Sequence, residues 1–285
     1  MPWRWHSHPT VWLVLGTSLL LYLVAVVAEG RRHRAGGGFG RATSIMQVVS
    51  FVLGVFTLEL GADWPMHDLA ERYLYSVHMV QHILFSFVAP PLLLLGVPAW
   101  LARRLLRPPH LRRVVFRVTR PLPALVLFNA VVVVTHWPAL VDITLRSEPA
   151  HFFAHLALFS TAMIMWMAVV SPLPEFPRLS SPARCVYLFL QSIIPTVPAS
   201  FLTFATHPIY KFYGHVPRLW GLGATEDQRI AGLIMKLGGG LLLWMLIGVV
   251  FFSWYVEEER ADARHSPRRL VRNPGPMSRS GSGER

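Results

Sequence analysis

Residues 74–97 have the sequence LYSVHMVQHILFSFVAPPLLLLGV, which contains no Asp, Glu, Lys or Arg. A helix needs about 20 mostly apolar residues to cross the hydrocarbon core of a bilayer. This stretch is therefore long enough for one crossing, and it carries two imidazoles, His78 and His82, near its beginning. The pair Pro90-Pro91 predicts a break or kink in the same helix, because proline donates no backbone hydrogen bond.

Six other stretches of the chain share this apolar character. The chain has 285 residues, of which 53% are hydrophobic, and this is too apolar for an ordinary soluble domain. The seven expected spans are 10–28, 44–60, 74–97, 122–140, 152–171, 185–206 and 230–254. We therefore expect an all-α, polytopic membrane helix bundle with about seven transmembrane helices.

Small residues and prolines refine this picture of the bundle. Pro195 and Pro198 predict a second helix break, in the sixth span, and Gly238–Gly240 permits close helix approach in the seventh. Residues 1–256 are expected to form one transmembrane domain. The segment 257–285 is rich in Arg, Ser, Gly and Pro, and its composition predicts a disordered basic tail.

The basic residues are distributed unevenly about the seven spans. The loops 29–43, 98–121 and 172–184, together with the tail, hold 20 of the 27 Lys and Arg residues, whereas the opposite side holds six. Positive residues accumulate on the cytoplasmic side, so we expect the N-terminus outside and the C-terminus in the cytoplasm. The net charge of +12 is then explained by topology and by attraction to anionic lipid headgroups at the cytoplasmic face, not by nucleic-acid binding.

The 13 histidines are also distributed unevenly. In the expected topology only three of them, His33, His110 and His265, fall on the cytoplasmic side. The other ten fall on or near the outer side, and they are His6, His8, His67, His78, His82, His136, His151, His155, His207 and His215. For isolated members of this set, polar contact with the membrane interface is the plainer explanation.

Two pairs of the outer histidines have a spacing that suggests a shared role. His78 and His82, like His151 and His155, are four residues apart, which places both imidazoles of a pair on one helix face. His136 ends the fourth span at a similar depth. Ionisable residues at such depth usually face the bundle interior and mark function. We expect these five side chains to bind a common ligand, although a plain polar network remains an alternative.

The residue types near these histidines favour copper. Neutral imidazole binds copper, zinc, iron and nickel, and the thioethers of Met79 and Met235 suit Cu(I). The single cysteine, Cys185, is expected at the cytoplasmic start of the sixth span, so no thiolate is available outside. Carboxylates on the outer side leave a zinc site open. A b-type haem held by two histidines is a further alternative, less favoured because the pairs cluster at one depth.

Motifs for common enzyme classes are missing from the sequence. There is no phosphate-binding P-loop, no G-x-S-x-G and no H-E-x-x-H. The sequence also has no acid pair with an obvious hydrolytic role. We therefore expect a protein that is not an enzyme.

Several motifs in sequence order resemble a known family. Residues 75–100 combine the H-x-x-x-H pair with an Ala-Pro-Pro turn and a Leu-rich run ending in Gly-Val-Pro. The motifs that follow are His136-Trp137-Pro138, His151-x-x-x-His155, and Asp227-Gln228 followed by Gly232-Leu233-Ile234-Met235. Over roughly 45–253 the chain resembles the multi-span CtaG family of cytochrome c oxidase assembly factors. It departs from the family pattern at Lys236, where the family tends to have an aromatic residue; this lysine is expected to snorkel outward or to pair with Asp227.

The resemblance implies a multi-pass protein of a bacterial-type cell membrane that helps to mature a haem-copper oxidase, by delivering copper. The implied partners are subunits of that oxidase. Carried over by position, the implied site residues are His78, His82, His136, His151, His155 and Asp227, with Met79 and Met235 as the soft ligands in reach. Two other functions remain open: a haem-binding or redox membrane protein, and a metal-free scaffold for oxidase subunits.

Overall fold

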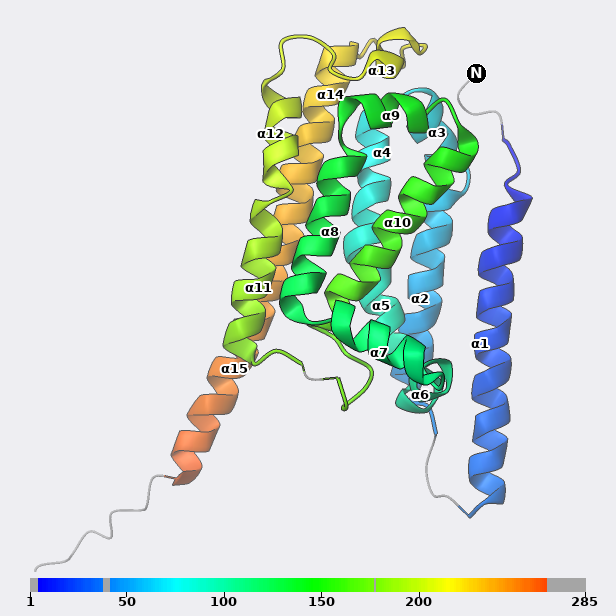
Figure 1. The fold of residues 1–285 in the computed structure, drawn as a ribbon, viewed down its shortest axis with the longest axis vertical. Helices are drawn as coiled ribbons and strands as arrows, with labels where there is room; N and C mark the ends of the chain where they lie inside the picture. The colour runs from blue at the N-terminus through cyan, green and yellow to red at the C-terminus, as the bar shows by residue number, and fades with distance from the viewer. Residues whose placement is uncertain (1–4, 38–41, 177, 266–285) are drawn as a thin grey trace, which may run out of the picture.

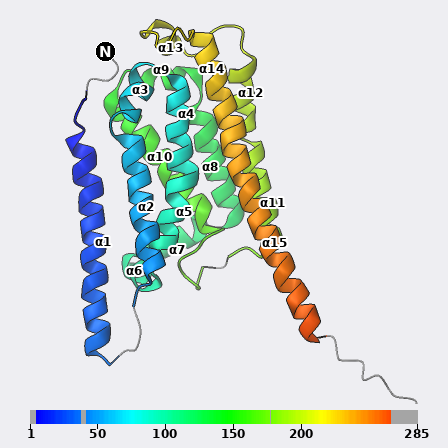
Figure 2. The same ribbon diagram turned by 180° about the vertical axis from the view of Figure 1, so that it is seen from behind.

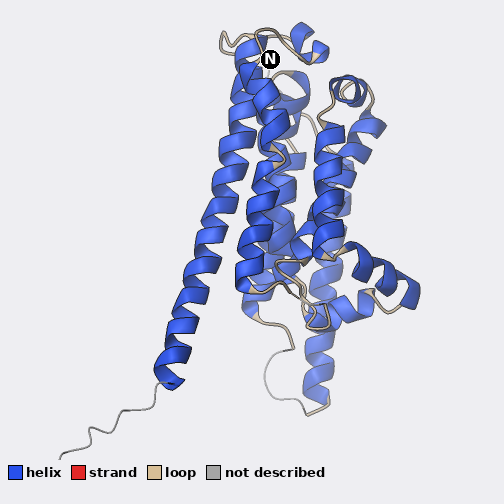
Figure 3. Cartoon of the chain, turned by 60° about the vertical axis from the view of Figure 1, so that its left-hand side comes forward, coloured by secondary structure: helices blue, strands red, loops and turns tan. Residues whose placement is uncertain are grey.

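A computed structural model describes residues 5–37, 42–176 and 178–265 of the chain, and every regular element within them is helical (Figure 3). The α-helices are α1 (Pro9–Ala35), α2 (Ile45–Ala62), α3 (Met66–Arg72), α4 (Tyr75–Ile83), α5 (Ala89–Gly96), α6 (Ala99–Leu105), α7 (Pro109–Val118), α8 (Pro121–Thr135), α9 (Pro138–Thr144), α10 (Glu148–Met167), α11 (Ser181–Ile193), α12 (Thr196–Phe204), α13 (Lys211–His215), α14 (Ala224–Leu233) and α15 (Gly240–His265). Two π-helical turns, η1 (Leu84–Val88) and η2 (Ile234–Gly239), join α4 to α5 and α14 to α15.

Among the described residues, six helical stretches are long and apolar enough to cross a membrane, and α7 with α8 forms a seventh if this pair, bent by 78°, is one span. The prediction of an all-α membrane bundle is confirmed. The fourth span differs from the predicted 122–140, because α8 ends at Thr135 and Pro138 begins the separate helix α9. The Pro138 nitrogen has no hydrogen to donate to the carbonyl four residues earlier, so helix α8 does not continue through it and the chain turns at His136.

The helices surround the segment formed by α4, η1 and α5 (Figure 1). In both opposite views, α2, α8, α10 and α14 lie around this segment, while α1 stands at the edge of the bundle beside α2 (Figure 2). The short helices α3, α9 and α13 gather at one end, which we call the upper end, and α6 and α7 lie at the other. Tyr22 fixes α1 to the bundle, because its ring stacks on Phe51 at 3.8 Å and its hydroxyl donates to the Gly96 carbonyl.

At the predicted break, the helix continues through Pro90-Pro91 but changes to a π-helical turn just before the two prolines. The π-helical turn η1 ends at Val88, and both prolines fall in the first turn of α5. Because the Pro90 nitrogen carries no hydrogen, the carbonyl of Ser86 lacks its usual helical donor. The indole Nε1 of Trp166, on α10, donates to that carbonyl at 2.8 Å. A neighbouring helix thus satisfies the group that the proline leaves free.

Two further predictions about helix shape are borne out. The sixth span is interrupted between Ile193, where α11 ends, and Thr196, where α12 begins. In the seventh span, a methyl group on Gly238 would lie 3.0 Å from Ile83 Cδ1, so the glycine permits close approach to α4. The π-helical turn η2 therefore packs beside the end of α4, where the π-helical turn η1 begins.

The last helix is longer than the sequence predicted. Helix α15 continues to His265, so residues 257–265, which were expected to be disordered, are helical. The segment Glu257–Arg264 is rich in Glu, Arg and Ala, and these strong helix formers can extend a helix that the membrane span has already nucleated. The rest of the predicted tail, 266–285, lies outside the described residues.

Candidate metal centre

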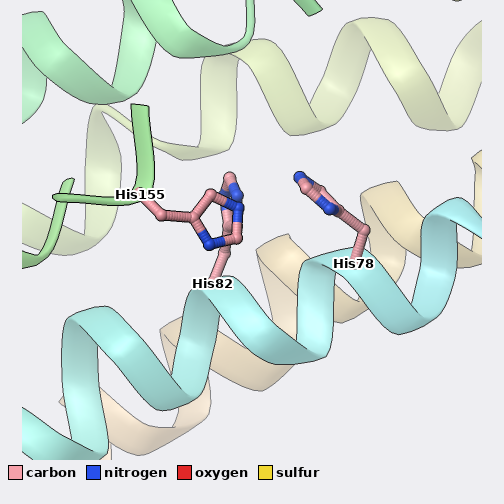
Figure 4. Close-up of side chains that lie close together, drawn as sticks. All are labelled: His78, His82 and His155. Carbon is pink, nitrogen blue, oxygen red and sulfur yellow. The ribbon is translucent and has the colours of Figure 1, made fainter. Parts of the chain in front are cut away.

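Five histidines from three helices meet near the upper end of the bundle. His78 and His82 project from α4 toward His155 on α10 (Figure 4). One ring nitrogen from each of these three residues lies within 4.8 Å of the other two. We call this set the inner triad. Three neutral imidazoles thus surround one point, an arrangement that can hold a metal ion.

The other two predicted histidines adjoin the inner triad. The ring centroids of His136 and His82 are 5.2 Å apart, and His151 Nε2 lies 2.9 Å from His155 Nε2. The five imidazoles therefore form one continuous cluster, and the side chains expected to converge do so.

His136 is held in a defined orientation. Its Nδ1 lies 2.7 Å from the carbonyl of Val132 and donates to it, which leaves Nε2 as the nitrogen with the free lone pair. The Tyr210 hydroxyl donates to the His136 carbonyl at 3.0 Å. Burial raises the pKa of Tyr210 to about 12, so the phenol remains a donor at neutral pH. These contacts present the Nε2 of His136 as a metal ligand would be presented.

Several ring nitrogens in the cluster have no hydrogen-bond partner among the described residues. They are Nδ1 of His78, both nitrogens of His82 and Nε2 of His136, and all four are buried. An unpartnered buried polar atom costs about 1–3 kcal/mol, so four in one place are unusual for a merely structural network. A metal ion bound among these rings would give their lone pairs a partner.

Two small cavities border the cluster. One, of about 20 Å³, is lined by residues that include His78, His151 and His155. The other, of about 40 Å³, is lined by residues that include His82, His136, Met79 and Met235. The two predicted methionines thus share a cavity with two of the histidines. Each space is of the size that holds a water molecule or an ion.

Asp227 has a different position from the one its predicted ligand role requires. Its Oδ2 accepts from the amide of Tyr75 at 2.7 Å, and its Oδ1 accepts from the amide of Ser76 at 3.1 Å. These amides are at the N-terminus of α4, where helix donors have no partner within the helix. Both oxygens are therefore occupied, and Asp227 caps and positions α4, the helix that carries His78 and His82.

The comparison with protein families agrees with this architecture. Residues 20–257 match the model of the cytochrome c oxidase caa3 assembly factor family, Caa3_CtaG. The chain belongs to this family. The match covers most of the described bundle, including all five clustered histidines, and it confirms the resemblance recognised from the motifs.

Similar proteins occur in mycobacteria. The chain is 27% identical over 209 residues to the uncharacterized proteins Mb0105 of Mycobacterium bovis and MT0111 of Mycobacterium tuberculosis, an alignment that covers 67% of this chain and 31% of each relative. It is 24% identical over 280 residues to the uncharacterized protein ML1998 of Mycobacterium leprae, covering 92% of this chain and 41% of the relative. The chain thus spans less than half the length of these relatives. No solved structure matches it.

Lys236, which was expected to snorkel outward or to pair with Asp227, lines neither of the two small cavities beside the histidine cluster. Its Nζ is 5.9 Å from the centroid of the Phe204 ring, and the side chain lines an open groove between α11–α12 and the last span. The expected ion pair with Asp227 does not form among the described residues, because backbone amides hold both oxygens of that carboxylate. A cation–π contact with Phe204 takes its place.

Residues that the sequence analysis left unassigned also contact the cluster. The Oε1 of Glu71 lies 3.2 Å from His151 Nδ1 and 3.2 Å from His67 Nε2. The sequence alone gives His67 no role beyond polar contact with the membrane interface. The i,i+4 spacing of His67 and Glu71 was a usable signal, but the short helix α3 that carries both was not expected.

Proposed function

We propose that this family member binds a copper ion as cargo through the inner triad and passes it to a subunit of a haem-copper oxidase during assembly. The observation that carries the proposal is the set of four buried, unpartnered ring nitrogens on His78, His82 and His136. Family membership supports the destination of the ion, because the family is one of cytochrome c oxidase assembly factors.

The geometry of the inner triad suits a transferable ion. Metal–nitrogen bonds to histidine are about 2.0–2.1 Å long, so nitrogens within 4.8 Å of one another need small side-chain rotations to share one ion. His136 and His151 adjoin the triad and offer further imidazoles. A three-coordinate ion with such neighbours can leave by stepwise ligand exchange, which a closed four-ligand site would hinder.

The donor set favours copper over zinc or haem. Imidazole and thioether together suit copper, and Met79 and Met235 line the cavity that His82 and His136 share. The thioethers distinguish this donor set from a zinc site, because zinc is bound by Cys, His, Asp and Glu side chains, and the Asp227 carboxylate is already occupied by amides. Haem requires far more room than the cavities of about 20 and 40 Å³ beside the histidines.

We propose that the upper end of the bundle faces outward. The 20-to-6 distribution of Lys and Arg supports this orientation, and residues 257–285 would then follow the membrane domain into the cytoplasm. Copper would be captured and released on the outer side, where the chain has no thiol that could compete for it.

Copper quantitation on detergent-purified protein tests the proposal. Wild type loaded anaerobically with Cu(I) should retain copper in a fixed ratio to protein after desalting. The double variant His78→Ala/His82→Ala should retain less than about a tenth of that amount, because it loses two of the three triad ligands. His110→Ala is the matched control, since His110 is exposed on α7 at the opposite end of the bundle.

Equal copper in wild type and the double variant would contradict the copper proposal. If such a variant also supported oxidase assembly, the histidines would be a structural network and the protein a metal-free scaffold. An absorption band of bound haem in the purified wild type, lost in the same variant, would instead favour the haem-binding alternative.

A further inference from the structure

The contacts around Glu71 extend the histidine cluster toward the surface. Its Oε1 lies 3.2 Å both from His67 Nε2, on α3, and from His151 Nδ1, on α10. One carboxylate oxygen thus joins imidazoles from two helices that are about 80 residues apart in the chain. We call His67, Glu71 and His151 the outer station.

His151 belongs to both groups of residues. Its Nδ1 faces Glu71, while its Nε2 lies 2.9 Å from His155 Nε2 in the inner triad. The two nitrogens of one imidazole therefore point to two different sets of ligands. A small rotation of this ring would present a bound ion to one set or to the other.

The side chains of the outer station are more exposed than the unpartnered ring nitrogens deeper in the cluster. The side chains of His67 and Glu71 are 24% and 27% exposed, whereas that of His151 is 8% exposed. Farther in, His82 and His136 include ring nitrogens with no accessible surface. The outer station is thus reachable from solvent at the upper end, whereas the unpartnered ring nitrogens of His78 and His82 in the inner triad are buried.

The N-terminal segment reaches the same place. The ring of His8 meets the ring of His67 edge-on, with centroids 4.8 Å apart, and His8 Nε2 lies 3.4 Å from Asp68. From His67 inward, neighbouring ring centroids are separated by 6.2 Å to His151 and then 4.3 Å to His155. Each step is short enough for two consecutive imidazoles to share an ion with modest side-chain movement.

We infer that the outer station is a second, transient binding site for the copper ion, through which the ion passes to the inner triad. His67 and His151 supply imidazole ligands, and the carboxylate of Glu71 orients both rings and compensates the charge of the incoming cation. The ion moves by ligand exchange, without change of oxidation state. This inference rests on the proposed function of the inner triad.

The rate of copper uptake distinguishes the outer station from the inner triad. Purified protein in detergent is mixed anaerobically with Cu(I) held by a coloured chelator, and the transfer is followed by stopped-flow absorbance. His67→Ala and Glu71→Gln should slow the transfer about tenfold, as is usual for loss of a supporting metal contact, while final copper per protein stays at the wild-type value. His215→Ala is the control, because this exposed histidine at the same end bonds only to the Lys211 carbonyl among the described contacts.

Uptake by His67→Ala and Glu71→Gln at the wild-type rate would overturn the outer station and leave the proposed function standing. Failure of wild type to take up copper would overturn both. A second measurement does not depend on filling the triad: His82→Ala/His155→Ala protein should retain weak Cu(I) binding, and addition of His67→Ala should abolish it. Residual binding that survives His67→Ala would also overturn the outer station.

Discussion

At the scale of single residues, hydrogen bonds decide which histidine nitrogen is free for a metal. His136 donates from Nδ1 to a carbonyl of its own helix, so only Nε2 can bind an ion. His82 has no partner on either nitrogen among the described residues, and its ring lies between His136 and His155. His82 is therefore the residue whose loss should weaken copper binding most.

Comparison of single histidine variants tests this ranking. His82→Ala removes the central imidazole and should lower the affinity for Cu(I) by about 10- to 100-fold, whereas His136→Ala, at the edge, should lower it less. Competition with a Cu(I) chelator of known affinity measures both changes. An equal effect of the two variants would show that the cluster binds copper without a central ligand.

Asp227 illustrates a residue that supports the site without touching the ion. Asp227→Ala leaves the amides of Tyr75 and Ser76 without their acceptor. Loss of such a helix cap costs about 0.5–2 kcal/mol, so the thermal midpoint in detergent should fall. Copper per folded protein at saturating Cu(I) should not change. A variant with wild-type stability and reduced copper would instead make Asp227 a ligand.

The clustered residues were only partly predictable from sequence. The i,i+4 pairs and their common expected depth favoured a shared site for His78, His82, His151 and His155, but they could not show that the helices carrying these residues are neighbours. The contacts of Glu71 with His151 and of Asp227 with α4 join segments that are 80 and about 150 residues apart. No local pattern encodes such contacts, since they depend on how α3, α10 and α14 are packed around α4.

At the scale of helices, the position of the site depends on how two interrupted spans are held together. In the α4–η1–α5 span Pro90 lacks an amide hydrogen, and the indole of Trp166, on α10, donates to the Ser86 carbonyl that is left free. This contact also fixes α10, which carries His151 and His155, against the span that carries His78 and His82. An irregularity of the helix at Pro90-Pro91 was predictable from the sequence. The π-helical turns and the hydrogen-bond donor to the Ser86 carbonyl were not.

Trp166→Phe tests this bond while preserving an aromatic ring. The substitution leaves the buried Ser86 carbonyl without a donor, which should destabilise the protein by about 1–3 kcal/mol. Thermal unfolding in detergent measures the loss. Trp137→Phe is the control, because Trp137 is 64% exposed. Equal midpoints for both variants would show that the indole bond contributes nothing to the helix packing.

Gly232 sets the distance between α14 and α12. A methyl group at this position would lie 2.7 Å from the Ala199 carbonyl oxygen and 2.5 Å from Thr203 Oγ1, so Gly232→Ala forces the helices apart. We expect a lower unfolding midpoint, by the equivalent of about 1–3 kcal/mol for an overpacked contact. Gly248→Ala, on α15, has no neighbour within 4 Å and should leave the midpoint unchanged or raise it. A lower unfolding midpoint for Gly248→Ala than for Gly232→Ala would contradict this packing of α14 against α12.

At the scale of the whole molecule, the histidine cluster and the Arg-rich helices α6 and α7 occupy opposite ends of one bundle. The N-terminal parts of α4 and α10, which carry the paired histidines, lie near the upper end beside the short helices α3 and α9, whereas α6 and α7 lie at the other end (Figure 1). Apolar runs predicted six of the spans to within several residues, whereas the fourth predicted span corresponds to the bent pair α7 and α8. The proposed orientation rests on the charge asymmetry alone, and it would decide on which side of the membrane the proposed uptake of copper occurs.

Labelling of introduced cysteines tests this orientation. In a Cys185→Ser background, Gly214→Cys places a thiol on the exposed helix α13 at the upper end, where no atom lies within 4 Å of the new side chain. Ser180→Cys places one in the exposed segment before α11. Because Lys and Arg are retained on the cytoplasmic side, a membrane-impermeant maleimide should label Gly214→Cys in intact cells and label Ser180→Cys only after permeabilisation. The opposite pattern would put the histidine cluster on the cytoplasmic side, and copper would then have to be captured from the cytoplasm.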